Sequence, residues 1–310
     1  MLDFICPICK KNLLKEQMGY GCGQCKIIYE EKDGIPALLP PLSSLKKGEA
    51  EYHANFEEDS VEVHQLLSWR NLFYHQKLWR FFDTLPECSR ILEVCGGSGF
   101  DAKRLLPRFY LTETDIAVGS LSRLKQNLST EENKKIYLVA ADAENLPFAN
   151  DYFDGSLMVA SLHHLPEPFK CLLEMRRILK PGGLLAIGVE PNYFYFHSLK
   201  KIQKQLYLLS HSGGEHSPAD EEADGFKKKE LKKIVEKAGF EIIAIKPMWL
   251  LAGFIHYFLE FVFRALKLKK RIKLPILFER AIVGFDEIIF KIPFIDRVGW
   301  HWNIFLRNSK

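Results

Sequence analysis

The chain lacks segments of the kind that carry a protein into or through a membrane. Its first residues, Met1 to Phe4, show no basic region followed by a long apolar run, so no secretory signal is expected. No stretch of about 18 or more apolar residues is free of charge. The nearest, residues 249–266, is interrupted by a histidine, a glutamate and an arginine. We therefore expect a cytoplasmic protein whose seven cysteines are reduced and available to pack, react or bind metal.

The chain also has little net charge, but that charge is unevenly distributed. Its 310 residues include 43 Lys and Arg against 39 Asp and Glu, a net charge of +4. The hydrophobic share of 47% and the charged share of 26% are typical of globular proteins and exclude disordered and fibrous classes. Residues 1–40 are neutral, residues 41–196 carry a net charge of −4, and residues 197–310 carry +8. The basic last third predicts an anionic partner, either a membrane surface or a nucleic acid.

Four of the seven cysteines fall within the first 25 residues, as two Cys-x-x-Cys pairs. Such pairs, separated by a hairpin-length spacer, can bring four thiolates around one tetrahedral Zn²⁺. Four protein ligands leave no open position for a substrate, so the predicted role is structural. Metal binding would also supply the folding free energy that a segment of about 40 residues cannot obtain from its own core. The predicted ligands are Cys6, Cys9, Cys22 and Cys25.

The segment that follows, Gly34-Ile-Pro-Ala-Leu-Leu-Pro40, extends this pattern. Together with the cysteine pairs it resembles the small zinc-ribbon partner proteins that activate certain methyltransferases. The resemblance covers residues 4–40 and implies a zinc-ribbon domain at residues 1–40.

A glycine-rich turn follows an apolar strand in the middle of the chain. Residues 91–94 are typical of a buried strand, residues 95–99 read Cys-Gly-Gly-Ser-Gly, and residues 100–106 predict a helix. Such a turn allows backbone amides to approach a ligand closely. Because residues 97–102 also fit the G-x-G-x-x-A form of a dinucleotide fingerprint, NAD binding stays open on this turn alone.

The residues downstream decide whether the glycine-rich turn belongs to a NAD-binding protein. A second strand, residues 109–115, ends in Asp115, which suits the hydroxyls of a ribose. Further strands are predicted at 135–141, 152–160, 184–190, 241–246 and 302–306, with a helix at 168–179 that ends at Lys-Pro-Gly-Gly. This order resembles the class I S-adenosylmethionine-dependent methyltransferases, especially the small-molecule, type 11-like branch that includes enzymes of quinone biosynthesis. Five motifs carry this resemblance: Glu93-Val-Cys-Gly-Gly-Ser-Gly99, the strand ending in Asp115, Asp142-Ala-Glu-Asn-Leu-Pro-Phe148, Phe153-Asp154 and Leu179-Lys-Pro-Gly-Gly183. A dehydrogenase is not expected to carry the last three of these five.

The resemblance implies a doubly wound, Rossmann-like α/β domain with a seven-stranded sheet at residues 89–310. A helical cap at residues 41–88 would precede it. It also implies S-adenosylmethionine as cofactor and a set of residues that bind it. Glu93 would hold the methionine ammonium group directly or through water, Asp115 the ribose, and Asp142 the adenine amino group. The methionine moiety would pass Cys95, Gly97 and Gly99, and the adenine would lie near Ile116 and Ala143.

The three acids also agree with the general rule that an open α/β sheet binds its ligand at the carboxyl ends of its strands. Two positions depart from the usual methyltransferase pattern. Cys95 replaces the first glycine of the turn, and Glu113 replaces a small residue before the ribose acid. We expect cysteine to be tolerated because it is small.

His163 and His164 follow the fourth strand, where acceptor and methyl group would meet. Either could act as a general base or orient the acceptor, and both could equally be ordinary residues leading into a helix. Methyl transfer from a sulfonium is an in-line displacement in which alignment supplies much of the acceleration, so a base is needed only if the acceptor must lose a proton.

The most individual feature is an insert between the last two predicted strands, at residues 249–294. Two apolar stretches, 249–266 and 276–294, flank six basic residues within ten positions. An apolar face beside a basic cluster suits peripheral contact with an anionic membrane. It also suits a lid over an apolar acceptor or a buried helical pair with a solvated edge. The basic residues are Arg264, Lys267, Lys269, Lys270, Arg271 and Lys273.

We therefore predict methyl transfer to a small-molecule acceptor, with lipid-linked and glycan-related molecules as favoured classes. The main alternative is an RNA methyltransferase that grips its substrate with the zinc ribbon. Nucleic acid is less favoured, because residues 1–40 are neutral and Ser161-Leu-His-His164 stands where an Asp-Pro-Pro-Tyr motif would hold a base amine. A third possibility is a non-catalytic scaffold that binds the cofactor.

Overall fold

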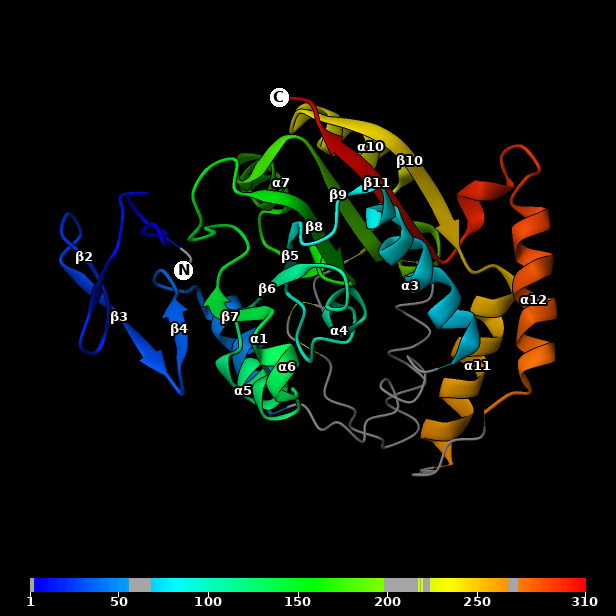
Figure 1. Cartoon of the computed structure of the whole chain (residues 1–310). Coiled ribbons are helices and arrows are strands. Elements are labelled where there is room, and N and C mark those ends of the chain that lie inside the picture. Colours follow the sequence, from blue (N-terminus) through cyan, green and yellow to red (C-terminus); the bar gives the residue numbers. More distant parts are fainter. Residues whose placement is uncertain (1–2, 56–67, 198–216, 218, 220–223, 267–272) are drawn as a thin grey trace.

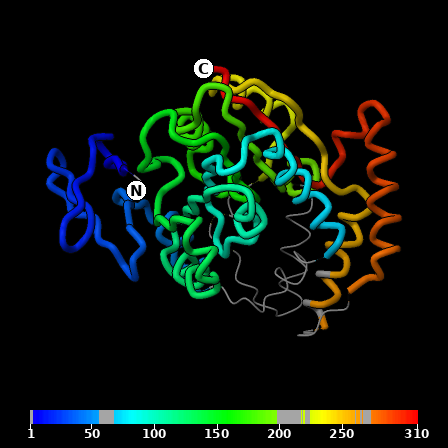
Figure 2. The backbone as a smooth tube through the Cα atoms, viewed as in Figure 1, coloured from blue at the N-terminus to red at the C-terminus, as the bar shows by residue number. Residues whose placement is uncertain are grey.

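The computed structural model describes residues 3–55, 68–197, 217, 219, 224–266 and 273–310 (Figure 1). Most of the basic cluster predicted in the insert, at residues 267–271, lies outside these ranges. A cysteine-bearing module stands at one end of the molecule and the helical insert at the opposite end, with a large sheet between them (Figures 1 and 2).

The N-terminal module is an antiparallel meander of four short strands. They are β1 (Leu14–Glu16), β2 (Gly19–Cys22), β3 (Ile27–Lys32) and β4 (Ile35–Leu38). The turn from β3 to β4 is Asp33-Gly34, with φ angles of +53° and +69°. Two left-handed residues make the type I′ turn that matches the twist of a two-stranded hairpin. The sequence pair Asp-Gly therefore sets the direction of β4.

Seven strands form the central sheet, in the order β7-β6-β5-β8-β9-β11-β10. All neighbouring pairs are parallel except those of β11, which runs antiparallel to both β9 and β10. This arrangement confirms the predicted α/β fold. The strands are β5 (Arg90–Val94), β6 (Tyr110–Asp115), β7 (Ile136–Ala141), β8 (Phe153–Val159), β9 (Leu179–Pro191), β10 (Phe240–Met248) and β11 (His301–Asn308).

The predicted count of seven strands is nevertheless wrong for the continuous sheet, which has eleven. β4 pairs in parallel with the edge strand β7, Ala37 facing Ala140 and Leu38 facing Ala141. The strands β3, β2 and β1 lie beyond β4 in that order and extend the sheet further. The physical reason is that an edge strand exposes unpaired backbone groups, and β4 satisfies those of β7. The sheet therefore runs continuously through both predicted domains.

Helices cover both faces of the sheet and bury two hydrophobic clusters. On one face α7 (Pro168–Ile178) and α10 (Lys228–Lys237) pack over the sheet. On the other face lie α3 (Trp69–Phe81), α4 (Ala102–Leu105) and α5 (Val118–Gln126). The apolar residues of α7 recur at 171, 172, 175 and 178, the spacing that directs one helical stripe inward. A short helix α6 (Thr130–Asn133) and the 3₁₀ turns η1 (Phe82–Thr84) and η2 (Leu162–His164) complete the domain.

Two predicted boundaries differ from the structure. The helix expected at residues 100–106 is the single turn α4. The break expected at Lys180–Gly183 does not form a separate turn, since β9 begins directly at Leu179 and pairs there with Phe153. The register shifts between that pair and the next, so the extra residues are accommodated as an irregularity within the strand.

The predicted cap contains α1 (Ser44–Ala54) and α3, which the undescribed residues 56–67 separate. Five residues separate the end of β4 from the start of α1, which is capped by Ser43, whose hydroxyl accepts from the Lys46 N–H. α1 packs beside α5. The N-terminal module therefore leads directly into the helix that crosses the carboxyl edge of β7.

The insert consists of α11 (Leu251–Ala265) and α12 (Ile276–Ile289), followed by the turn η3 (Ile295–Val298). The two helices pack side by side and against α3, burying Trp249, Ile282 and Val283 in a third cluster. Asp286 of α12 accepts from the backbone N–H groups of residues 250–252 and so caps the start of α11. Within the described ranges, none of the helices combines the length and the apolar character needed to cross a bilayer.

Candidate functional site

The three predicted cofactor acids lie on adjacent strands at one edge of the sheet. Glu93 is the penultimate residue of β5, Asp115 ends β6 and Asp142 follows β7. All three are buried. Ala143, beside Asp142, is buried, and Ile116, beside Asp115, is half-buried. Because these strands are parallel, their carboxyl ends bring together residues that are far apart in the sequence.

The glycine-rich turn contacts Asp115 directly. The Gly97 N–H donates to Asp115 Oδ2 at 3.0 Å, and the Ala117 N–H donates to Oδ1 at 2.8 Å. Gly97 and Gly99 have φ angles of +58° and +69°, and Cys95 has +57°. The left-handed conformation explains why glycine suits the first position of this turn, and it makes Cys95 a strained substitute. The turn and the ribose-type acid therefore form one hydrogen-bonded unit.

Beneath this turn lies a buried pair of carboxyl groups that the sequence analysis did not recognise. Glu93 and Glu113 are register partners on β5 and β6, and both side chains are buried. Among the described residues, Glu93 Oε2 and both carboxyl oxygens of Glu113 have no hydrogen-bond partner. Burial raises the pKa of both groups well above that of an exposed carboxyl, and their mutual repulsion adds to this shift for Glu113. Burial and the proximity of the two carboxyl groups therefore favour their protonated forms.

This pair predicts a pH-dependent stability. A carboxyl whose pKa is raised on folding lowers the free energy of unfolding as the pH rises above the ordinary carboxyl range. The reason is that this carboxyl then ionises readily in the unfolded chain but not in the folded one. Replacing Glu113 with Gln removes that loss, because the amide occupies nearly the same volume and does not ionise. We expect Glu113→Gln to raise the free energy of unfolding by about 2 kcal/mol at pH 8, with little change near pH 5.

Urea unfolding at both pH values measures this effect, with Glu131→Gln on the exposed surface of α6 as the control. Parallel pH profiles for the wild type and Glu113→Gln would contradict the assignment.

Asp142 is already engaged by protein groups. Its two oxygens accept from Lys46 Nζ, both at 2.8 Å, and also from the Glu144 N–H and the Asn145 side chain. Lys46 lies on α1 and also contacts Glu144 at 2.7 Å. An adenine amino group that approached Asp142 would therefore share it with Lys46. The lysine is a site residue that sequence analysis missed.

The two histidines have different surroundings. His163 Nδ1 contacts Glu190 at 2.9 Å, and the Glu190 carboxylate also accepts three backbone N–H groups, from residues 161–163. Burial alone would raise the pKa of Glu190, but His163 and these amides hold it below the usual range. This arrangement fastens η2 to the end of β9 and is structural in character.

His164 instead contacts Glu49 of α1. Its Nδ1 lies 3.2 Å from Glu49 Oε2 and 3.3 Å from the Ser217 hydroxyl. Burial would raise the pKa of Glu49, but hydrogen bonds from His164, His53 and the Ala219 N–H hold it below its usual range. Glu49 therefore presents an ionised carboxylate to His164. Glu49 and His53 lie four residues apart on one helix face. This spacing is the only sequence pattern that could have pointed to Glu49.

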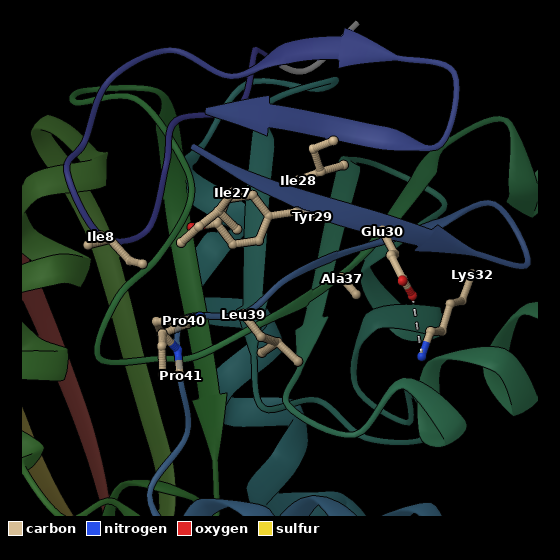
Figure 3. Close-up of a pocket in the computed structure, with 10 residues that line it drawn as sticks. All are labelled: Ile8, Ile27, Ile28, Tyr29, Glu30, Lys32, Ala37, Leu39, Pro40 and Pro41. Carbon is tan, nitrogen blue, oxygen red and sulfur yellow. Dashed lines mark ion pairs between the residues drawn. The ribbon is translucent and has the colours of Figure 1, made fainter. Parts of the chain in front are cut away.

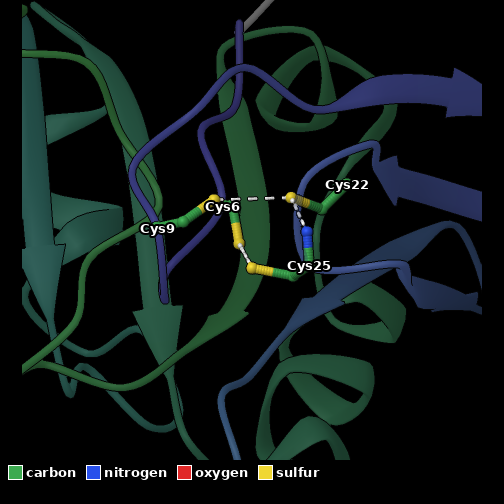
Figure 4. A group of neighbouring side chains, drawn as sticks. All are labelled: Cys6, Cys9, Cys22 and Cys25. Carbon is green, nitrogen blue, oxygen red and sulfur yellow. Dashed lines mark hydrogen bonds between the residues drawn. The ribbon is translucent and has the colours of Figure 1, made fainter.

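The four N-terminal cysteines converge, as Figure 4 shows. Cys6 Sγ lies 3.9 Å from Cys25 Sγ, and Cys9 Sγ lies 3.5 Å from Cys22 Sγ. Four sulfurs at about 2.3 Å from a tetrahedral Zn²⁺ would be separated by about 3.8 Å, so the observed spacing fits that ion. All four are free of disulfides. Burial opposes ionisation of Cys6, but hydrogen bonds from Tyr29 and backbone amides lower its pKa to about 6.

A groove of about 300 Å³ lies in the same module, and none of the strand-end acids lines it (Figure 3). Its walls are mainly aliphatic side chains and prolines, with Glu30 and Lys32 paired at one end. It brings together no set of polar groups comparable to that around Asp115. The groove is therefore not a candidate for the cofactor site.

Comparisons with known proteins bear on the class of the protein. Residues 92–187 match the family model described as a methyltransferase domain. A demethylmenaquinone methyltransferase of Bacillus cereus is 29% identical over 195 residues, which cover 56% of this chain and 81% of that protein. The residues matched by the family model, 92–187, include the glycine-rich turn and all three strand-end acids.

Solved structures agree on the fold. Phosphoethanolamine N-methyltransferase 2 of Haemonchus contortus superimposes with a TM-score of 0.56 at 17% identity, covering 88% of this chain and 61% of that one. A complex of the Haloferax volcanii Trm112 methyltransferase activator with a methyltransferase gives a TM-score of 0.51 at 15% identity, covering 84% of this chain and 96% of that one.

The domain match and the fold together define the protein as an S-adenosylmethionine-dependent methyltransferase with the class I α/β fold.

Proposed function

We propose that the protein transfers a methyl group from S-adenosylmethionine to a small, lipid-linked acceptor. The observation that carries the cofactor site is the unit formed by Asp115 and the glycine-rich turn, at the carboxyl edge shared by β5, β6 and β7. Asp115 would hold the ribose hydroxyls, Glu93 the ammonium group and Asp142, beside Lys46, the adenine. S-adenosylmethionine supplies an electrophilic methyl group when it is bound.

The proposed acceptor site lies over η2, between α1 and the insert. Ser161 Oγ donates to the Cys95 carbonyl at 3.4 Å, so η2 directly adjoins the glycine-rich turn. His164, oriented by Glu49, would take a proton from the acceptor or hold its reacting group in line. The chain's part in catalysis would be to align the acceptor and to provide for that proton.

The aromatic surroundings support an apolar acceptor. His301 of β11 neighbours His163 and Trp249, and burial with the nearby His163 lowers the pKa of His301 to about 3. Tyr257 of α11 hydrogen-bonds His301 at 3.1 Å and stacks on Trp300. A prenylated quinone precursor is the first acceptor to test, because the relative from Bacillus cereus is a demethylmenaquinone methyltransferase.

The cofactor site can be tested by calorimetric titration with S-adenosylhomocysteine. We expect Asp115→Asn to weaken binding about 10- to 100-fold, because a carboxylate that accepts two ribose hydrogen bonds contributes more than an amide. Asp154→Asn, on β8 and paired with Lys180, is the matched control and should bind as the wild type does. Equal affinity in both variants would contradict the ribose role of Asp115.

The acceptor class is tested with radiolabelled methyl groups. Transfer from S-adenosylmethionine into a lipid extract, and not into RNA, is the expected result. Transfer into RNA alone would overturn the small-molecule proposal in favour of the nucleic-acid alternative.

We further propose that the N-terminal module is a zinc ribbon that braces the methyltransferase sheet from within the same chain. Its support is the sulfur geometry and the pairing of β4 with β7. The resemblance of residues 4–40 to zinc-ribbon proteins that activate methyltransferases is consistent with such a role. Such a brace would stabilise the strand that precedes Asp142 and fix the position of α1.

A further inference from the structure

The outward face of α12 carries a long apolar stripe. Leu277, Phe285 and Ile288 recur at helical spacing, and Ile292 continues the stripe just past the helix end. Leu277 is 79% exposed and Ile288 is 63% exposed. Ala281 and Gly284, between them, are exposed as well. An exposed stripe of large aliphatic and aromatic side chains costs hydration free energy and marks a contact surface.

The acidic residues of α12 all turn away from this stripe. Glu279 is buried and pairs with Arg70 of α3, and Asp286 is buried at the cap of α11. Glu287 pairs with Lys77 of α3 at 2.7 Å. The outward face of α12 therefore presents no unpaired negative charge.

Positive charges remain on the exposed side. Arg280 is exposed on the same helix, Lys273 precedes it and Lys291 follows it. Lys273 and Lys291 stand just outside the two ends of α12, so they flank the apolar stripe. Apolar side chains with cations at their border are complementary to the acyl boundary and anionic headgroups of a bilayer.

α11 has a second exposed apolar stripe. Phe254, Phe258 and Phe261 follow one another at intervals of four and three residues, and each is at least 45% exposed. The two helices pack together at the end of the molecule opposite the N-terminal module (Figure 1). An interfacial contact there would leave the cysteine cluster clear of the membrane.

We propose that the α11–α12 pair is a docking surface for an anionic lipid bilayer, from which the enzyme takes its acceptor. The uptake of the acceptor from the bilayer rests on the proposed function, whereas the binding of the helix pair to the bilayer does not. The aromatic residues around His301 lie at the inner side of the same helix pair, since Tyr257 belongs to α11. An acceptor anchored in the bilayer would thus meet the protein next to η2.

Co-sedimentation with vesicles of phosphatidylcholine alone and of phosphatidylcholine with about one third phosphatidylglycerol tests the surface. We expect binding to the anionic vesicles at low salt, weaker binding at high salt and little to the neutral ones. The double variant Leu277→Glu and Ile288→Glu should lose at least about tenfold in affinity. Lys273→Glu with Lys291→Glu should lose a similar factor and flatten the salt dependence.

Met18→Glu is the matched control, since Met18 is 76% exposed on the N-terminal module. It should bind as the wild type does, and circular dichroism should show that every variant is folded. Absence of binding to anionic vesicles, or equal binding by the wild type and Leu277→Glu with Ile288→Glu, would overturn the proposal. A wild-type dimer that these two substitutions dissociate, without vesicle binding, would assign the surface to a second copy of the chain. Because no acceptor is present, these outcomes are independent of whether the proposed acceptor class is right.

Discussion

Replacing Cys22 with Ser is expected to unfold the N-terminal module and to destabilise the methyltransferase sheet with it. The module has strands of three to six residues and a small buried core. Structural zinc contributes about 10–16 kcal/mol to the folding of such small modules, more than most whole domains retain as net stability. A serine hydroxyl cannot replace the thiolate. Metal content should therefore fall from about one zinc per chain towards none.

The loss should spread beyond the module because of its contacts. β4 pairs with β7, the Ile5 N–H donates to the Pro147 carbonyl, and Lys10 pairs with Glu174 of α7 at 2.7 Å. α1, with Lys46 and Glu49, follows the module directly. We expect cofactor affinity and methyl transfer to fall with the metal content, and amide exchange at Ala140 and Ala141 to accelerate.

Cys88→Ser is the control, because Cys88 is exposed and lies outside the cluster. Elemental analysis, urea unfolding and hydrogen exchange on both variants provide the measurements. If Cys22→Ser kept its metal and its stability, the zinc proposal would be refuted. If it lost zinc while the exchange of β7 was unchanged, the bracing role alone would fail.

Replacing His164 with Ala is expected to lower kcat by about 100- to 1000-fold, the usual contribution of a general acid or base. Cofactor affinity should stay within about twofold, because His164 contacts Glu49 and Ser217, which are not predicted cofactor ligands. Glu49→Gln should reproduce part of the loss, since the amide still occupies the position but no longer stabilises a protonated imidazole. Turnover with the acceptor found in the methyl-transfer assay, together with calorimetric binding of the cofactor, measures both effects.

The double variant distinguishes a coupled pair from two separate contributions. If Glu49 acts through His164, then Glu49→Gln combined with His164→Ala should be no slower than His164→Ala alone. His197→Ala, at an exposed histidine paired with Asp224, is the matched control. A full kcat in His164→Ala would remove the base hypothesis and leave alignment as the chain's main contribution.

Local patterns were enough to predict much of this molecule. The apolar run at residues 91–94 and the glycines after it marked a strand, a turn and a ligand edge, because these depend on neighbouring residues only. The cysteine pairs and the helix expected at residues 168–179 are local in the same sense. The order of motifs added the α/β fold and the class of enzyme.

Contacts between distant segments could not be predicted in this way. Lys46 meets Asp142 and Glu49 meets His164 across about 100 residues of chain, and no periodicity connects them. Glu113 looked like a replaced small residue, yet its register opposite Glu93 makes it half of a buried acid pair. The extent of the sheet was also undetermined, because which strand covers the edge of β7 depends on where the N-terminal module docks.

The sequence by itself indicated the strands of the central sheet, the cysteine pairs, the acids at the strand ends and the apolar insert, since residue type and spacing encode each of them. Only the tertiary structure decided that the sheet continues into the N-terminal module, that the two histidines have different partners, and that α12 turns its acids inward. Those outcomes depend on which surfaces pack together. Packing sums many weak contacts between segments far apart in the chain, and no short pattern records that sum.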